Sequence, residues 1–222
     1  MRKIPTSVAG NSINIEGIPD AVRVVALRGS HAKRLADLAL HRKDLAFADD
    51  CLVSLTTVPE GSDVIQEALW RSAIVHFFKC FGDGARFKLS PNRILRGEDP
   101  KAMIVFRHFE NLRNKHFVHD ENSYLQCIPV AAINDGSKAY KVEEVLCVSL
   151  MGLTLEQAAF DNFRSLVIKT REWVEVAYDD LTAEIKRQLE AETYAALLAM
   201  PAPQIAGAEP SSAGVRRPTA SR

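Results

Sequence analysis

The segment VIQEALWRSAIVHFF, residues 64–78, decides the fold that the sequence predicts. Its apolar residues recur at intervals of three and four, so Val64, Ala68, Val75 and Phe78 share one broad face of a helix. The preceding GSD is a helix start signal, and the GDG that follows Phe81 ends the pattern. We expect this helix to be central, because so wide an apolar face must be covered by other elements.

Helical periodicity continues on both sides of this segment. Leucines at positions 35, 38, 45 and 52 predict a first long helix over about Ser30 to Leu55. Asp99 followed by Pro100 predicts the start of a third helix, because the carboxylate accepts otherwise unpaired amides and proline has no amide to leave unpaired. The segment between, up to Gly97, lacks a clear period and is expected to be a loop or short irregular turns.

The period changes beyond residue 122. Tyr124–Ile133 and Tyr140–Leu150 are rich in valine and isoleucine and are separated by Asn-Asp-Gly-Ser, which predicts a β-hairpin. Thr154 with Gln157 forms the pattern of a capping box and predicts a long final helix that runs to Met200.

These elements predict a mainly α fold, a bundle of four to five long helices with a small β-hairpin insertion. We expect residues 1–20 to be an N-terminal arm and residues 21–198 to be one helical domain, with the hairpin at about 124–150. Residues 199–222 are dominated by Pro, Ala, Ser and Gly, a composition that predicts a disordered tail.

Composition excludes several classes of protein. The 222 residues are 47% apolar and 25% charged, which is ordinary for a globular chain. The longest apolar run, Tyr194–Met200, has seven residues against the roughly 20 that a membrane helix needs. The 28 basic and 28 acidic residues cancel, so a polyanion must meet a local patch. The four cysteines are too far apart for a zinc or redox motif, and we expect buried, reduced thiols in a cytoplasmic protein.

The stretch FENLRNKHFVHD, residues 109–120, is where chemistry is most concentrated. On a helical wheel Arg113, His116, His119 and Asp120 fall on the same side as the apolar residues around Phe109. Ionisable groups on a buried face are costly unless they are paired, so this cluster requires partners, a ligand or a second chain.

Three interpretations of the cluster remain open. In the first, Arg113 and Asp120 form an ion pair and the histidines are hydrogen-bonded core residues. In the second, His116 and His119 with Asp120 bind a metal ion, although the sequence offers no further ligand pair. In the third, Arg113 and a histidine stabilise charge and transfer a proton, which suits attack of a ribose 2′-hydroxyl on its own phosphodiester.

The residues Arg113-Asn114, followed after four positions by His119, resemble the signature of HEPN domains (higher eukaryotes and prokaryotes nucleotide-binding). The resemblance extends over about Ser62 to Leu198. It implies a metal-independent endoribonuclease without a cofactor, a homodimer whose motifs face each other, in toxin, phage-defence or RNA-processing systems. His119 would then transfer protons, Arg113 would stabilise the phosphorane and Asn114 would orient the scissile phosphate.

This sequence departs from the pattern of one branch of the family. Toxins paired with nucleotidyltransferase antitoxins carry a tyrosine two positions after the histidine, where this chain has Glu121. Regulation by adenylylation at that tyrosine is therefore not supported by the residues. The resemblance still implies an antitoxin or a defence-system protein as a partner.

Substrate binding requires cations, and the loop from Gly84 to Gly97 has four and no acid. Phe87 lies among them and is expected to stack a base while the cations contact phosphates. The predicted substrate-binding residues are Arg86, Lys88, Arg93, Arg96, Lys115 and His116.

Two other interpretations compete with a nuclease. The first is a non-catalytic HEPN-like module that binds a nucleotide or a protein and uses the same face to dimerise. The second is a helical domain unrelated to this family.

Overall fold

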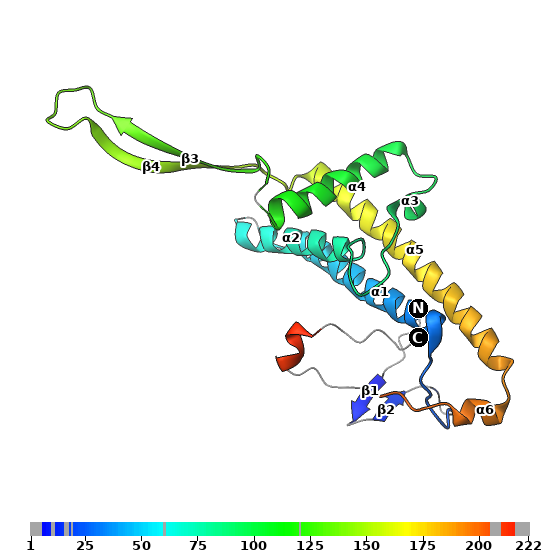
Figure 1. Cartoon of the computed structure of the whole chain (residues 1–222). Coiled ribbons are helices and arrows are strands. Elements are labelled where there is room, and N and C mark those ends of the chain that lie inside the picture. Colours follow the sequence, from blue (N-terminus) through cyan, green and yellow to red (C-terminus); the bar gives the residue numbers. More distant parts are fainter. Residues whose placement is uncertain are drawn as a thin grey trace. The chain divides into compact units, whose positions relative to one another are not determined.

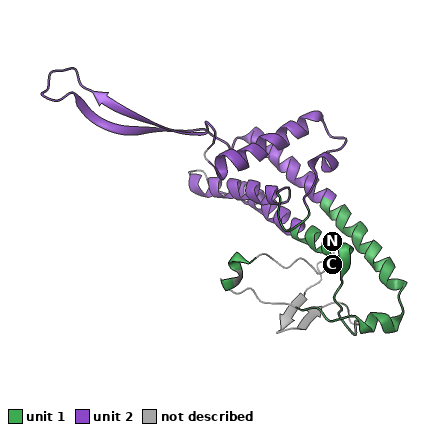
Figure 2. Cartoon of the chain, viewed as in Figure 1, with its two compact units in different colours: residues 1–40, 83–87, 174–222 green, residues 41–82, 88–173 purple. Residues whose placement is uncertain are grey.

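The structure is a computed structural model of the chain, and it describes residues 6–9, 12–15, 18, 20–59, 61–119, 121–204 and 210–215. The chain divides into two compact units, which are coloured separately in Figure 2. Unit 1 comprises residues 1–40, 83–87 and 174–222, and unit 2 comprises residues 41–82 and 88–173.

Unit 2 is a group of helices with a β-hairpin between the last two (Figure 1). Residues 41–55 of α1 and 157–173 of α5 belong to it, and six further elements lie wholly within its residue ranges. Their bounds are α1 Gly29–Leu55, α2 Asp63–Lys79, α3 Pro91–Ile94, α4 Pro100–Leu112, the π-helix η1 Arg113–Phe117, β3 Leu125–Ile133, β4 Val142–Met151 and α5 Gln157–Glu190.

The core of unit 2 is built from aromatic rings on α2, α4 and α5. Trp70, Phe77, Phe109 and Phe163 are almost completely buried. Their rings meet edge to face or tilted, with centroids 5.4 Å apart for Trp70 and Phe163 and 4.8 Å apart for Phe109 and Phe163. Such arrangements add about 0.5–1.5 kcal/mol per pair to the burial of apolar area. The mainly α fold with a hairpin is therefore confirmed. Helix α2 contributes Trp70, Phe77 and Phe78 to the core, whereas Val64 of its predicted apolar face is 83% exposed.

Of the three predicted helix starts, only one has the expected side-chain cap, and Ser62 before α2 makes no side-chain capping hydrogen bond. Asp99 caps α4, and its Oδ1 accepts a hydrogen bond from the Lys101 amide at 2.8 Å, as predicted. Thr154 does not cap α5. Its buried Oγ1 instead accepts a hydrogen bond from Trp70 Nε1 at 3.2 Å, because a buried indole N–H requires a partner.

The hairpin pairs β3 with β4 antiparallel, with Ile128 opposite Val148 and one bulge next to Ile133. Every residue of both strands is exposed. At its base the Gly152 amide donates to the Tyr124 carbonyl at 2.7 Å, and a Cβ at Gly152 would lie 2.9 Å from the Tyr124 ring. Only glycine therefore fits where the strand leaves the hairpin.

The predicted final helix is divided. The helix α5 ends at Glu190, and a short helix, α6 (Tyr194–Ala199), follows in unit 1. Thr193 caps α6 by accepting a hydrogen bond from the Ala196 amide at 3.2 Å. A second cap restarts the helix, so the helical pattern alone did not reveal the break.

The two ends of the chain carry structure that the sequence analysis did not predict. Within the predicted arm, β1 (Thr6–Ala9) pairs antiparallel with β2 (Ser12–Ile15), and these strands are rich in β-branched residues. Within the predicted disordered tail, Pro210–Gly214 forms the 3₁₀ helix η2, and residues 205–209 and 216–222 lie outside the described residues. The carbonyl of Pro201 accepts a hydrogen bond from the Ala26 amide at 2.7 Å.

Among the described residues, none of the helices combines the length and the apolar character that crossing a bilayer demands.

Candidate functional site

The motif residues occupy a π-helix at the end of α4. The α-helical pattern stops at Leu112, and Arg113–Phe117 form η1. A π-helical turn is rare and is found frequently at functional sites, because the extra residue redirects the side chains around it. The sequence analysis placed 109–120 on one continuous α-helix, whereas the α-helical geometry ends at Leu112.

Arg113 is half-buried and lies beside Asn114. Its Nη1 donates a hydrogen bond to Asn114 Oδ1 at 2.7 Å, whereas its buried Nε has no hydrogen-bond partner within the described part of the chain. An unsatisfied buried donor costs about 1–3 kcal/mol, and more when the group is charged. The guanidinium therefore has one donor that no described group uses, and its hydrogen bond to Asn114 helps to orient it.

His116 is the buried member of the motif, with 6% of its surface exposed. Its ring lies 5.2 Å from the Phe117 ring and 5.4 Å from the Tyr124 ring, centroid to centroid. Packed between two aromatic rings, this imidazole joins the π-helix to the base of the hairpin. The wheel placed His116 on the buried face correctly.

His119 and Lys115 are exposed. His119 lies past the π-helix, where its carbonyl accepts a hydrogen bond from the Glu121 amide at 3.0 Å. Lys115 Nζ lies 3.7 Å from Glu121 Oε2. The wheel had put His119 on the buried stripe, and the chain's departure from helical geometry explains the difference. Asp120 lies outside the described residues.

Helix α2 also contacts the motif, through Arg71 and Phe117. Arg71 places its guanidinium carbon 5.0 Å from the centroid of the Phe117 ring, a cation–π contact, and its Nε donates to Glu67. The sequence analysis did not single out Arg71 or Tyr124. No spacing in the sequence signals them, because both approach the motif through tertiary packing.

The structure does not bring the basic loop to the motif. Arg93 on α3 and the exposed Arg96 precede α4, whereas the motif follows it. The 13 residues of α4 separate the two ends by about 20 Å, at 1.5 Å per residue. Lys88 is also exposed, and it follows the turn at the end of α2.

Arg86 and Phe87 belong to unit 1, and Arg86 is half-buried. Phe87 was predicted to stack on a base, but its ring already contacts another side chain. The Arg34 guanidinium carbon lies 4.2 Å from the centroid of the Phe87 ring, and the Phe87 amide donates to Asp37 Oδ2 at 3.2 Å. The ring therefore already has a cationic neighbour.

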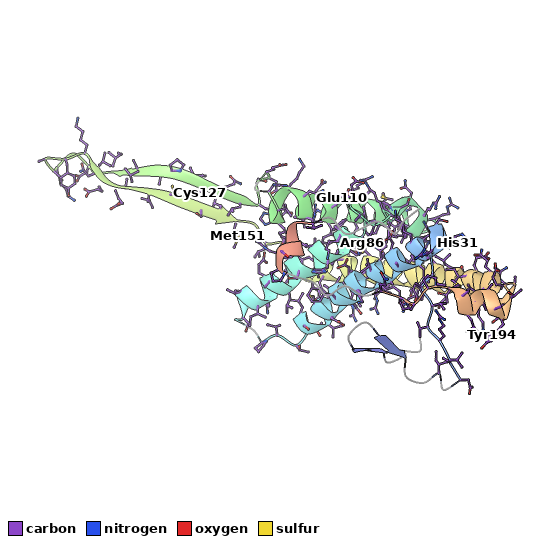
Figure 3. The ribbon with its side chains drawn as sticks, turned by 60° about the horizontal axis from the view of Figure 1, so that its bottom comes forward. His31, Arg86, Glu110, Cys127, Met151 and Tyr194 are labelled. Atoms are coloured by element: carbon purple, nitrogen blue, oxygen red, sulfur yellow. The ribbon has the colours of Figure 1, made fainter. Side chains whose placement is uncertain are left out.

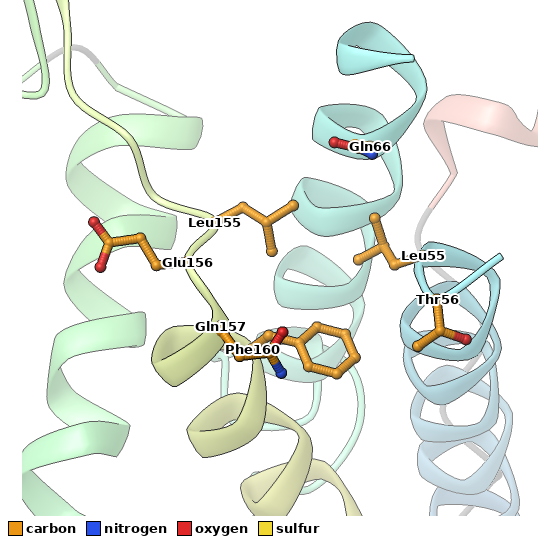
Figure 4. Close-up of a pocket in the computed structure, with 7 residues that line it drawn as sticks. All are labelled: Leu55, Thr56, Gln66, Leu155, Glu156, Gln157 and Phe160. Carbon is orange, nitrogen blue, oxygen red and sulfur yellow. The ribbon is translucent and has the colours of Figure 1, made fainter. Parts of the chain in front are cut away.

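A pocket of about 480 Å³ opens at another place in unit 2, between the end of α1 and the start of α5. Figure 4 shows Leu55, Leu155 and Phe160 turned toward the pocket, whereas the Glu156 carboxylate turns away from them. Gln66 and Thr56 supply neutral polar groups. The pocket thus lacks the paired proton-transfer groups that would make it a stronger catalytic candidate than the motif.

No group of three histidine, cysteine or acidic side chains is placed to hold a metal ion among the residues that the structure describes. The metal interpretation needed Asp120, which is not one of them. We find no match to this chain among protein-family models, curated proteins or solved structures.

Proposed function

We propose that this chain is a cytoplasmic, metal-independent endoribonuclease of the HEPN type, with Arg113, Asn114 and His119 as its site. One observation carries the proposal: the signature residues begin on a π-helix that leaves the Arg113 Nε buried without a partner. A guanidinium held in this way is suited to a phosphate, whose oxygens accept several charge-assisted hydrogen bonds.

The proposed reaction uses side chains of the chain and water, and it needs no metal ion. His119 takes the proton of a ribose 2′-hydroxyl, whose oxygen attacks the adjacent phosphorus. The new O2′–P bond forms as the bond from phosphorus to the leaving 5′-oxygen breaks, that oxygen takes up a proton from water, and the protonated His119 then returns its proton to the solvent. The products are a 2′,3′-cyclic phosphate and a free 5′-hydroxyl. Arg113 stabilises the charge on the pentacovalent phosphorus, and Asn114 orients the phosphate.

The remaining predicted contacts divide by distance from the reacting phosphate. Lys115 is an exposed neighbour of Asn114, and His116 is buried beneath the surface of the π-helix. Arg93 and Arg96, at the far end of α4, are assigned to phosphates farther along the strand. Such contacts increase affinity for any sequence and weaken with salt.

A second copy of the chain is part of the proposal. Arg113 is half-buried in the π-helix whereas His119 is exposed on the loop beyond it. If Arg113 of one copy serves the same phosphate as His119 of another, mixing Arg113→Ala and His119→Ala chains will restore activity that neither has alone. A toxin or phage-defence system is the proposed setting, in which cleavage of cellular RNA stops growth.

The direct test is cleavage of structured RNA in the presence of a chelator. We expect products with 2′,3′-cyclic phosphate ends, and a loss of about 10²–10⁴-fold in rate for His119→Ala, the usual contribution of a general acid or base. The matched control is His108→Ala, because His108 is also an exposed histidine of this segment but lies on α4 outside the motif. An absence of cleavage across several RNAs, or equal losses in both variants, would contradict the proposal.

A non-catalytic binding module is the second candidate, and the exposed apolar hairpin favours it. For this function we expect Arg113→Ala and His119→Ala to alter oligomeric state or melting temperature and no chemical activity. Size-exclusion chromatography and calorimetry on the same variants distinguish the two functions.

A further inference from the structure

The hairpin β3–β4 presents apolar side chains that no described residue of its own unit covers. One face carries Ile128, Val130, Leu146, Val148 and Leu150, each at least 37% exposed. In Figure 3, where Cys127 and Met151 are labelled, side chains of both strands project into open space on either side of the ribbon. A two-stranded hairpin is marginally stable in water at best, and a third strand or a helix is normally needed. The hairpin therefore requires a partner.

The two outer edges of the hairpin are not equivalent. Pro129 lies in the middle of β3, opposite Cys147. Proline has no N–H to donate, so it is tolerated only where its nitrogen faces away from the neighbouring strand. Pro129 therefore blocks the outer edge of β3, a common device against unwanted strand pairing.

The outer edge of β4 has no such protection. Because Cys147 opposes a proline, this pair is not hydrogen-bonded, and the Cys147 amide and carbonyl face outward. Because backbone groups alternate between the two edges along a strand, those of Val145 and Ser149 lie on the same edge as those of Cys147. From Val145 to Met151 the strand has neither charge nor proline. Within the described residues β4 pairs only with β3.

We propose that β4 pairs antiparallel with β4 of a second copy of this chain, about a two-fold axis at Val148. The resulting sheet has four strands, which exceeds the minimum for independent stability. Its outer strands are the two copies of β3, both blocked by Pro129. The same edge is used by both copies, so the assembly closes at two chains and does not grow into a fibre.

The charges on β4 select the antiparallel arrangement. Glu143 and Glu144 are the only charged residues of this strand, and both lie near the tip of the hairpin. A parallel, in-register pair would place each acid opposite its own copy, which is destabilising. The antiparallel pair sends the two sets of acids to opposite ends and aligns Val145 with Met151 across the seam.

The pairing does not depend on the proposed nuclease activity. With the axis at Val148, Gly152 of one copy is eight positions along the strand from Gly152 of the other, or about 26 Å. The hairpin bases, and the motifs next to them, are held apart. Hairpin pairing and a composite nuclease site are therefore separate properties, and either can fail without the other.

Cysteine cross-linking tests the pairing in the full chain. Val148→Cys is made in a background of Cys127→Ser and Cys147→Ser, which removes the native exposed thiols. On the two-fold axis the two new thiols form a non-hydrogen-bonded pair, with Cα atoms about 4.5 Å apart, within reach of a disulfide. We expect mild oxidation to give a covalent dimer on a non-reducing gel.

The matched control is Ile128→Cys in the same background. Ile128 lies directly opposite Val148 within the hairpin and is 44% exposed against 41% for Val148. In the proposed sheet its two copies are three strand spacings apart, about 14 Å, and no dimer should form. Equal cross-linking of both variants would indicate random collision and overturn the proposal.

Sedimentation of chains with native cysteines provides a second measurement, which does not rely on the cysteine variants. We expect the wild-type chain to self-associate, and Val148→Lys to weaken that association at least tenfold by placing two cations on the axis. A wild-type chain that sediments as a monomer and whose cysteine variant does not cross-link would assign the β4 edge to a different partner. Association unaffected by Val148→Lys would assign it to another surface.

Discussion

The aromatic core of unit 2 and the hairpin β3–β4 are both rich in apolar residues, but their exposure is opposite. Trp70 and Phe163 have no exposed surface, whereas Val145 and Met151 are each 69% exposed. Hydrophobicity is therefore not what distinguishes the two regions. The difference shows that burial depends on which elements are available to cover a face.

Geometry explains why the helices succeed where the hairpin does not. Each helix needs cover for one apolar stripe, and α2, α4 and α5 supply it to one another. A hairpin has two faces and two edges, and no further strand of the described chain pairs with it. The proposed pairing with β4 of a second copy would supply the missing cover.

Thiol labelling should give the largest contrast between the two regions. Cys127 and Cys147 on the hairpin are exposed, whereas Cys51 and Cys80 are buried, contrary to the expectation that all four are buried. Burial, with a smaller contribution from Asp50, also raises the pKa of the Cys51 thiol and reduces its reactive thiolate.

If labelling of the buried pair requires global unfolding, with a free energy of at least about 5 kcal/mol, it will be at least about a thousandfold slower than labelling of the hairpin pair. Mass spectrometry of peptides after timed labelling measures both rates. Comparable rates for all four thiols would mean that the helical core opens as readily as the hairpin.

Truncation of a core ring should be the next largest effect. Phe163→Ala removes a fully buried side chain that contacts three other rings, and we expect a loss of about 3–5 kcal/mol in the free energy of unfolding. Leu146→Ala on the hairpin is the control, with an expected change within about 0.5 kcal/mol at concentrations where chains do not pair. Urea unfolding followed by circular dichroism measures both, and similar losses would show that the hairpin belongs to the core.

The smallest expected effect is on the free energy of unfolding, when the helix cap of α4 and a turn in the hairpin each lose one hydrogen bond. Asp99→Ala removes the acceptor for the Lys101 amide and should cost about 0.5–2 kcal/mol in the free energy of unfolding. Asn134→Ala removes the acceptor for the Gly136 amide in the hairpin turn, a hydrogen bond of the same kind at 2.9 Å. We expect this variant to leave global unfolding unchanged and to increase amide hydrogen exchange in β3 and β4 only. A shift in global unfolding would join the hairpin to the cooperative unit.

The elements of the fold were predicted well because each leaves a periodic signal in neighbouring residues. The first helix begins at Gly29 against a predicted start at Ser30, and the strands lie within two residues of the predicted bounds. One failure occurred where a distant residue intervened. Thr154 matches a capping box by spacing, yet its hydroxyl accepts from Trp70, 84 positions away in the sequence.

The candidate site was predicted less completely than the fold. The wheel correctly buried His116, but it could not anticipate the π-helix, which places Arg113 and His119 in different environments. Arg71 and Tyr124 reach the motif only after α2 and the hairpin base pack against η1. The basic loop is close to the motif in sequence but is separated from it by the length of α4.

The sequence alone determined the long helices and the hairpin β3–β4, because those patterns repeat over a few residues and depend on backbone geometry common to all proteins. It also concentrated arginine, asparagine and histidine in one short stretch. The tertiary structure decided which of these side chains is buried and where the α-helix changes to the π-helix η1. It also decided that the residues of β3 and β4 are exposed. These outcomes depend on contacts between residues far apart in the chain, and local periodicity carries no information about them.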